Sequence, residues 1–419
     1  MTSPSSSLWS LDQTIGRRVV DRAGLLVALG LGYFEGADLA SMGPTLSRIS
    51  KALSLDPGQA GLCASASLVG LVLGAAVGGR LADRLGRTPM LVIASVLLGV
   101  FSLATTFAWD FGSLAVLRFL AGLGMGGLLP VILAMGGDAA QPSFRATAIG
   151  MVIASGSLGG VTVGLISLLP DWRLVFVFGG LGPLVVLPLL FWLRPATRTP
   201  GSALEAAGPS LLATLFGEGR ARGTLIIWAV SFCTVLASYI MINWLPSLLT
   251  LQGVDERTSR AASIVYGLGS IVGNLSSGQV TDRGRPRLAY LIGFVGAALC
   301  VTGLARLGPA SAFVLIFFTA ICIIGAQLVT YSLASTHYPD DGRVTGLGGT
   351  VSAGRCGSVV GPVLAGELLH RGFAADAVFL SLAPVFLLAL VMGLVLASVM
   401  ARRGSLALVP VGGTGSVSD

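Results

Sequence analysis

The amino-acid sequence predicts an all-α membrane protein with twelve transmembrane helices arranged in two six-helix halves. Three observations lead to this fold class. First, 54% of the 419 residues are hydrophobic and only 11% are charged, whereas a soluble domain usually carries about 25% charged residues. Second, twelve stretches are apolar over the roughly 20 residues that a helix needs to cross a bilayer. Third, a polar loop in the middle of the chain separates the first six stretches from the last six.

The apolar stretches follow one another with short polar loops between them. We expect the first six helices at 24–46, 60–80, 89–108, 113–136, 147–169 and 173–193. The second six are expected at 224–250, 261–280, 288–306, 310–334, 345–368 and 375–400. The polar loop between the halves contains three prolines and four arginines. The predicted domains are therefore 1–193 and 223–419, with 194–222 as the linker.

The basic residues are distributed unevenly between the two sides of the predicted helices. Seventeen of the 26 fall in the termini and in the loops on the same side, the linker included, and seven fall in the opposite loops. The remaining two, Arg118 and Arg355, lie within predicted helices. Loops rich in arginine and lysine stay in the cytoplasm, so the sequence predicts a multi-pass protein with both termini cytoplasmic.

Composition and motif content argue against several classes of function. The net charge of +7 is spread over short loops, which disfavours nucleic-acid binding because no single basic patch results. The five cysteines lie in apolar stretches, and the two histidines are too far apart for a metal pair. We find no nucleophile–base set, so we expect no enzyme, no metal and no cofactor. A signalling receptor would normally need a sizeable cytosolic domain, which the sequence lacks.

Two loops in equivalent positions of the halves carry a similar charged pattern. Gly-Arg-Leu-Ala-Asp-Arg-Leu-Gly-Arg occupies 79–87, and Gly-Gln-Val-Thr-Asp-Arg-Gly-Arg, one residue shorter, occupies 278–285. The aspartate of such a loop can accept hydrogen bonds from a helix N-terminus or from an arginine of the other half. This predicts a latch that holds one conformation, although the loops could also serve only as anchors for the helix ends. The expected latch residues are Gly79, Asp83, Arg84, Arg87, Arg118, Asp282 and Arg343.

Arg118 lies inside the predicted helix 113–136, in its second turn. A charge at the centre of a membrane helix costs about 2.5–3.5 kcal/mol on insertion scales. We therefore expect Arg118 to face the protein interior and to have a partner there. The residue serves either as a structural tether or in the coupling of protons and conformational change.

Small residues at four-residue spacing recur in equivalent helices of the two halves. Gly70, Gly74 and Gly78 lie in the second stretch, and Gly269 and Gly273 lie in the eighth. Stripes of this kind let helices approach closely. Their recurrence predicts surfaces on which the two halves slide or rock against each other.

Glu35 and Asp38 place two carboxylates on one face of the first predicted helix, because residues three apart are neighbours on a helix surface. If both are buried they repel, and one proton is then gained or lost near neutral pH. This predicts a proton-coupling site, with Asp138 as the next candidate. Two alternatives stay open: Asp38 pairs with an arginine, or the two acids lie at a water-filled mouth.

Arg355 lies deep in the second half, within the predicted helix 345–368. A guanidinium can bind a carboxylate through two parallel hydrogen bonds. Arg355 is therefore expected to bind an anionic substrate, unless it forms an internal salt bridge with an acid of the first helix. Aromatic and amide side chains elsewhere in the half could line a cavity. They are Tyr239, Asn243, Trp244, Tyr266, Gln327 and Tyr331, and each could equally serve in packing.

With these residues assembled, the sequence resembles the aromatic acid:proton symporter family of the major facilitator superfamily over nearly its full length. The loop 79–87 and the run that begins at Arg118 resemble superfamily motifs. The subfamily usually has Asp-Gly-x-Asp in the first helix, and Glu35 replaces the first Asp as in the phenylpropionate branch. The matching stretches are Glu35–Leu39, Leu81–Arg84, Phe101–Thr105, Ile242–Pro246 and Gly361–Pro362.

The resemblance implies a major facilitator fold and a symporter that works by alternating access. It implies import of an aromatic carboxylate, such as a hydroxyphenylpropionate or hydroxybenzoate, with protons across the bacterial inner membrane. Such a carrier is expected to work as a monomer. By position, the resemblance assigns function to Glu35, Asp38, Asp83, Arg118, Asp138, Arg343 and Arg355. A carrier of another organic anion and a proton-driven exporter are the alternatives, and export fits an acid pair with a deep arginine less well.

Overall fold

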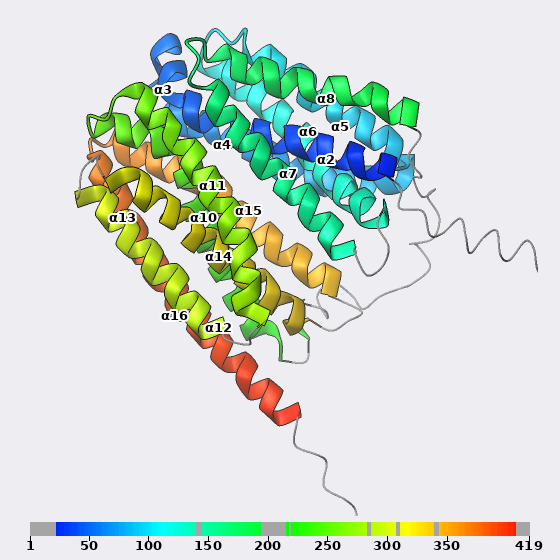
Figure 1. Cartoon of the computed structure of the whole chain (residues 1–419), viewed down its shortest axis with the longest axis vertical. Coiled ribbons are helices and arrows are strands. Elements are labelled where there is room, and N and C mark those ends of the chain that lie inside the picture. Colours follow the sequence, from blue (N-terminus) through cyan, green and yellow to red (C-terminus); the bar gives the residue numbers. More distant parts are fainter. Residues whose placement is uncertain are drawn as a thin grey trace, which may run out of the picture. The chain divides into compact units, whose positions relative to one another are not determined.

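The computed structural model describes residues 22–139, 145–193, 215–217, 219–282, 286–306, 311–338 and 343–407. Every regular element within these ranges is a helix (Figure 1). The chain divides into two compact units, one of Met1–Glu205 with Arg257–Gly267 and one of Ala206–Glu256 with Leu268–Asp419. Most of the predicted linker 194–222 lies outside the described residues, so the predicted domain boundaries stay a prediction.

The helices of the first unit follow the predicted stretches of the first half. They are α2 (Arg22–Leu39), α3 (Met42–Leu53), α4 (Pro57–Leu85), α5 (Arg87–Thr105), α6 (Phe111–Ala139), α7 (Arg145–Ile166) and α8 (Arg173–Leu193). Local sequence signals explain several of their ends. Asp56 and Gln59 cap the start of α4 reciprocally, each side chain accepting a hydrogen bond from the other residue's backbone N–H at 2.9 and 3.2 Å. Gly86, with a φ of +92°, makes the one-residue turn between α4 and α5 that few other residues could adopt.

The second unit repeats this pattern. Its helices are α10 (Ala221–Leu251), α11 (Glu256–Asp282, whose first turns belong to the first unit), α12 (Pro286–Tyr290), the π-helix η2 (Leu291–Val295), α13 (Gly296–Arg306), α14 (Ala312–His337), α15 (Arg343–His370) and α16 (Ala375–Ala407). The segments α12, η2 and α13 follow one another without a gap and cover the predicted stretch 288–306. The α13 helix lies beside α16 (Figure 1).

Hydropathy supports the membrane class. Seven of the described helices are long and apolar enough to cross a bilayer, and α2 with α3 makes an eighth if this pair, bent by 42°, counts as one span. The other four predicted stretches correspond to α7, α8, α11 and α15. Within the described residues, the apolar parts of α7 and α8 are Gly150–Ile166 and Arg173–Leu189, which are too short to count as full spans. The count of twelve spans therefore stays a prediction.

Glycines set how closely helices approach inside each unit. A Cβ atom on Gly70 or Gly74 of α4 would lie under 3.0 Å from a backbone carbonyl oxygen of α6, and one on Gly269 of α11 would lie 2.5 Å from the Phe317 carbonyl oxygen of α14. Both contacts join helices of the same unit. The prediction that these stripes lie between the halves is therefore wrong. The absence of a Cβ atom at these glycines is what lets α4 pack closely on α6 and α11 pack closely on α14.

A second helix pair repeats in the same way. A Cβ on Gly36 of α2 would collide with the backbone of Gly156 in α7, and one on Gly357 of α15 would collide with the Phe232 carbonyl oxygen of α10. These pairs hold equivalent places in the order of helices along each half. The two units therefore share their internal packing as well as their loop motifs, as expected of a fold built from repeated halves.

Candidate functional site

Asp38 and Arg118 form a buried ion pair in the first unit. The Arg118 Nη2 donates to Asp38 Oδ2 at 2.7 Å and Nη1 donates to Oδ1 at 3.2 Å. Both side chains have no exposed surface. Two parallel N–H···O bonds between a guanidinium and a carboxylate form one of the strongest polar contacts in proteins. Arg118 therefore has the interior partner that its position predicted, and the alternative in which Asp38 pairs with an arginine describes this structure.

Two further helices complete the surroundings of this ion pair. Ser102 of α5 donates from Oγ to Asp38 Oδ1 at 2.5 Å, and the Phe176 ring of α8 lies 5.3 Å from the Arg118 guanidinium carbon. Gly179 of α8 leaves the space that this cluster fills, since a Cβ there would lie 3.3 Å from Asp38 Oδ1. Four helices thus enclose one carboxylate and one guanidinium in an apolar region.

The bend between α2 and α3 begins directly after Asp38. The Asp38 carbonyl oxygen accepts hydrogen bonds from the backbone N–H of Ser41 at 3.1 Å, from Ser41 Oγ at 2.6 Å and from Arg118 Nη2 at 3.4 Å. These bonds replace the regular helical partners that the bend removes. Broken helices at membrane depth are characteristic of substrate and ion sites, because they expose backbone groups only inside the protein.

Glu35 lies one turn before Asp38 on the same helix and is also buried, with 6% of its surface exposed. The alternative in which the two acids lie at a water-filled mouth does not fit this burial. The structure therefore places both predicted acids in the interior of the first unit. Their role in proton coupling stays a prediction.

Asp138 lies away from this pair, at the other end of α6. Its Oδ2 accepts a hydrogen bond from Arg87 Nη1 at 2.6 Å, and both side chains are about a quarter exposed, at 25% and 28%. Twenty residues of helix separate Asp138 from Arg118, which is roughly 30 Å at the rise of an α-helix. Asp138 is thus joined to an expected latch residue, Arg87, rather than to the acid pair.

The other expected latch residues lie at helix ends. Gly79, Asp83 and Arg84 fall in the last turns of α4, Asp282 ends α11 and Arg343 begins α15. The side chains of these residues lie outside the described part of the structure. Arg118 belongs to the buried cluster with Asp38, and the latch itself stays a prediction.

Arg355 of α15 contacts α10 in the second unit. Its Nη1 donates to the Tyr239 hydroxyl at 2.7 Å, and the Asn243 side chain donates to the Tyr239 carbonyl oxygen at 3.0 Å. The Trp244 indole N–H donates to the Pro362 carbonyl oxygen of α15 at 3.0 Å. Trp244 therefore joins α10 to α15, and Arg355 is half-buried.

The remaining predicted cavity residues lie on two other helices. Gln327 and Tyr331 of α14 are neighbours, with the Gln327 amide donating to the Tyr331 hydroxyl at 2.8 Å. Tyr266 of α11 is buried, and it belongs to the segment Arg257–Gly267 that groups with the first unit. The structure thus joins Arg355 with Tyr239 and Asn243, and it joins Gln327 with Tyr331, within the second unit.

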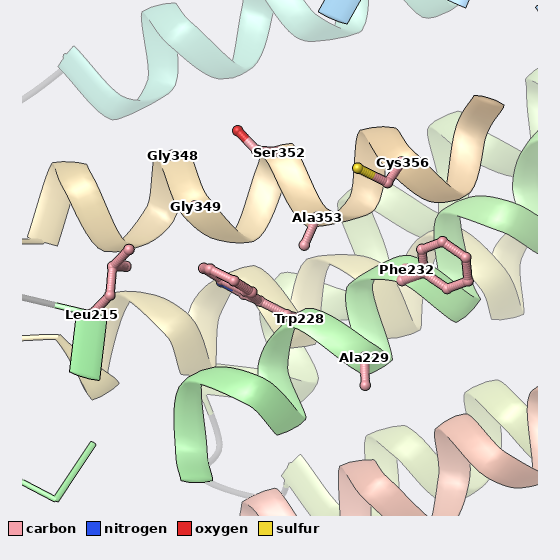
Figure 2. Close-up of a pocket in the computed structure, with 9 residues that line it drawn as sticks. All are labelled: Leu215, Trp228, Ala229, Phe232, Gly348, Gly349, Ser352, Ala353 and Cys356. Atoms are coloured by element: carbon pink, nitrogen blue, oxygen red, sulfur yellow. The ribbon is translucent and has the colours of Figure 1, made fainter. Parts of the chain in front are cut away.

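An apolar groove of about 760 Å³ lies between α10 and α15. Figure 2 shows the Trp228 indole between the two helices and Phe232 one turn further along α10. The wall from α15 includes Ser352 and Cys356, which lie three residues before and one residue after Arg355. The lining residues are Leu215, Trp228, Ala229, Phe232, Gly348, Gly349, Ser352, Ala353 and Cys356.

Comparison with protein families decides what kind of protein carries this arrangement. The model of the Major Facilitator Superfamily matches residues 28–354 and, in a second match, 261–407. The chain belongs to the Major Facilitator Superfamily. Membership confirms the expected all-helical membrane fold and the expected class of transporter rather than enzyme. Two overlapping matches within one chain also fit a facilitator built from two similar halves.

Solved structures and curated relatives agree with this assignment. The crystal structure of a D-xylose–proton symporter superposes with a TM-score of 0.70 at 17% identity, covering 90% of this facilitator and 96% of that chain. The 3-(3-hydroxy-phenyl)propionate transporter of Escherichia coli is 37% identical, over 96% of this chain and 97% of its own. A gallate transporter of Pseudomonas putida is 30% identical over 87% and 90%. The 4-hydroxybenzoate transporter of Pseudomonas putida is 28% identical over 85% and 88%. The sequence resemblance to an aromatic acid family is thereby confirmed.

Some residues of the facilitator's polar clusters were not predicted from sequence. Ser102 and Phe176 lie in apolar stretches, where one serine or one phenylalanine has no pattern that separates it from packing. Trp228 and Phe232 are four residues apart on α10, a spacing that indicates a shared helix face but not a groove. Only the fold brings Ser102 and Phe176 to the charged residues and places Trp228 and Phe232 along a groove.

Proposed function

We propose that this chain is a proton-coupled symporter that imports a small aromatic carboxylate, such as a hydroxyphenylpropionate or hydroxybenzoate, by alternating access. It works in the bacterial inner membrane with both termini cytoplasmic, and a single chain suffices. Its relatives support the substrate class, because the three that are described above are named for transport of hydroxyphenylpropionate, gallate and 4-hydroxybenzoate. All three compounds carry one carboxylate on or near a hydroxylated ring.

The observation that carries the proposal is the contact between Arg355 and Tyr239. The Arg355 side chain is half-buried, and its Nη1 donates to the Tyr239 hydroxyl of α10 at 2.7 Å. A planar guanidinium binds a carboxylate through two hydrogen bonds. In this arrangement Arg355 receives the anionic group, and Tyr239 fixes the direction of the guanidinium.

The groove between α10 and α15 suits the ring of such a substrate. Phe232 and Tyr239 are seven residues apart and therefore share one face of α10. Trp228 and Phe232 offer flat aromatic surface, and small-molecule sites usually combine apolar walls with a few placed polar groups. The groove thus extends along the face of α10 that also bears Tyr239.

Protons are needed because the substrate is an anion. Import of a negative charge opposes an inside-negative potential by about 2.3 kcal/mol per 100 mV. One proton per substrate cancels this charge, and Asp38 and Glu35 are the buried acids that could carry it. The first unit then handles the proton and the second unit handles the carboxylate.

Uptake by purified protein in liposomes tests the proposal. A panel of radiolabelled aromatic acids is offered with an imposed pH gradient, acid outside, and each acid is paired with its neutral amide. The proposal predicts accumulation of at least one hydroxylated aromatic acid only when the gradient is present, and little transport of its amide. Equal transport of an acid and its amide would contradict import of a carboxylate. Movement of the substrate from the liposome interior toward the acidic outside would contradict import with protons.

A further inference from the structure

We infer that Ser102 of α5 is a positioning residue for Asp38, and that its hydroxyl supports this carboxyl group in both of its protonation states. The inference deepens the proposed function, because it rests on Asp38 as the group that takes up and releases the proton.

Ser102 has no exposed surface, and the hydrogen-bond partner of its hydroxyl lies on another helix. Serine and threonine in helices usually bond a carbonyl three or four residues earlier. Thr105, one turn further along α5, does this with the Phe101 carbonyl oxygen. Ser102 Oγ instead donates to Asp38 Oδ1 at 2.5 Å, from α5 to α2.

A second acceptor lies close to the same hydroxyl. The Phe176 carbonyl oxygen of α8 is 3.5 Å from Ser102 Oγ. When Asp38 is ionised, Ser102 donates its proton to the carboxylate, and such a bond stabilises the charged form. When Asp38 carries a proton, the Ser102 O–H can turn to the Phe176 carbonyl oxygen, and Oγ then accepts the O–H of the carboxylic acid. The hydroxyl keeps its own proton in both arrangements.

The charged groups around Asp38 cannot bond both of its protonation states, whereas Ser102 can. Arg118 of α6 donates to both oxygens of Asp38 and is a donor only, so it can bond the ionised form but cannot accept from the protonated form. Among the described residues, two other titratable groups lie near this cluster. Glu35 is one turn before Asp38 on α2, and Cys63 on α4 lies near Arg118. The arginines that begin α5, α7 and α8 lie at helix ends. Among the described side chains that bond the carboxyl group of Asp38, Ser102 is the one that can both donate and accept.

The test compares four forms of the purified protein: wild type, Ser102→Ala, Ser102→Thr and Ser95→Ala. Ser95 is the matched control, because it lies two turns earlier on the same face of α5, is equally buried, and has a hydroxyl with no hydrogen-bond partner in the described structure. The protonation of Asp38 is followed by infrared difference spectroscopy across pH, with its carbonyl band assigned by Asp38→Asn. The pH dependence of substrate uptake is measured in parallel.

The bond to the ionised form is the shorter of the two contacts, so its loss favours the protonated form. We expect Ser102→Ala to move the midpoint of the Asp38 band by about one pH unit toward alkaline values, and to move the uptake profile in the same direction. Ser102→Thr, which keeps the hydroxyl, and Ser95→Ala are expected to titrate as the wild type does.

An unchanged infrared midpoint in Ser102→Ala, or an equal shift in Ser95→Ala, would overturn the inference. The infrared titration needs no substrate. If it shifts as expected while no form shows proton-driven uptake, the inference about Ser102 stands and the proposed function fails.

Discussion

Individual side chains carry most of the chemistry of this protein, because a charge inside a bilayer is stable only beside a group that compensates it. Arg118 has a carboxylate as its partner, and Arg355 has the Tyr239 hydroxyl. The first contact is a salt bridge between opposite charges, whereas the second joins a guanidinium to a phenol hydroxyl. These are the two contacts to which the proposed function gives proton coupling and anion binding.

Replacement of Arg355 by lysine tests the anion site at the residue scale. Lysine keeps the charge but cannot form the planar pair of hydrogen bonds. Since hydrogen bonds to charged groups contribute about 1.5–3 kcal/mol, we expect the apparent affinity for the aromatic acid to fall roughly tenfold or more. Concentration-dependent uptake measures this change. The control is Arg371→Lys, directly after the end of the same helix, where an exposed ion pair with Glu367 leads us to expect no effect. Wild-type affinity in Arg355→Lys would remove Arg355 from the substrate site.

At this scale the sequence predicts which charged residues need partners, but not always the partners themselves. An arginine inside the stretch 113–136 must have one for energetic reasons, and Asp38 was a candidate because it could pair with an arginine. The assignment of Asp138 shows the limit. Its place in α6 does not reveal that Arg87 is its neighbour, because their contact depends on how α5 returns along α6.

The packing of single helices depends on where one helix can approach another closely. Gly70 and Gly74 bring α4 against α6, and Gly36 brings α2 against α7. In lipid there is little hydrophobic force between helices, so such close packing contributes much of the stability of a membrane protein. The glycine stripes are therefore part of each unit's core.

Addition of a methyl group to a packed glycine tests this role. A Cβ on Gly74 would overlap the Leu123 carbonyl group, whereas a Cβ on Gly150 of α7 would meet nothing within 4 Å. Overpacking typically costs about 1–3 kcal/mol, so we expect Gly74→Ala to lower the melting temperature in detergent by several degrees. Gly150→Ala should melt as the wild type does. Equal melting temperatures for both variants would contradict the packing assigned to α4 and α6.

Helix positions could be predicted well from sequence, and helix interruptions could not. The stretch 224–250 corresponds to α10 at Ala221–Leu251, because apolar length alone defines it. The stretch 24–46 was expected as one helix, but the chain bends by 42° between α2 and α3. Pro44 lies in the first turn of α3 and cannot donate to the Ala40 carbonyl oxygen, but the apolar stretch continues across it and the bend was not predicted. It depends on hydrogen bonds that Ser41 and Arg118 make to the Asp38 carbonyl oxygen, and Arg118 is 80 residues away.

The whole molecule is a pair of units with the same order of packed helices. The repeat was recognisable from the loops 79–87 and 278–285, since both the motif and its position recur. The glycine stripes were recognised too, but their partners were misjudged, because a stripe indicates close packing without indicating which helix it meets. Family membership was predictable because superfamily motifs are specific to this fold.

The orientation of the molecule follows from its loops. Seventeen basic residues lie on the predicted cytoplasmic side and seven on the other, so both termini are expected in the cytoplasm. A fluorescent protein joined after Asp419 should be bright in bacterial cells, and alkaline phosphatase joined at the same position should be inactive. Active phosphatase with a dark fluorescent fusion would place the C-terminus outside and contradict the predicted orientation.

The central claim is that Asp38 couples the proton to import, and one comparison in liposomes tests it most directly. Accumulation under a pH gradient and exchange between equal substrate pools are measured for wild type, Asp38→Asn and Asp138→Asn. Asparagine mimics a carboxyl group that never releases its proton, so we predict that Asp38→Asn loses accumulation but retains exchange, which also shows that the variant is folded. Asp138→Asn, whose side chain pairs with Arg87 at the far end of α6, should keep both activities. Normal accumulation by Asp38→Asn would contradict the account.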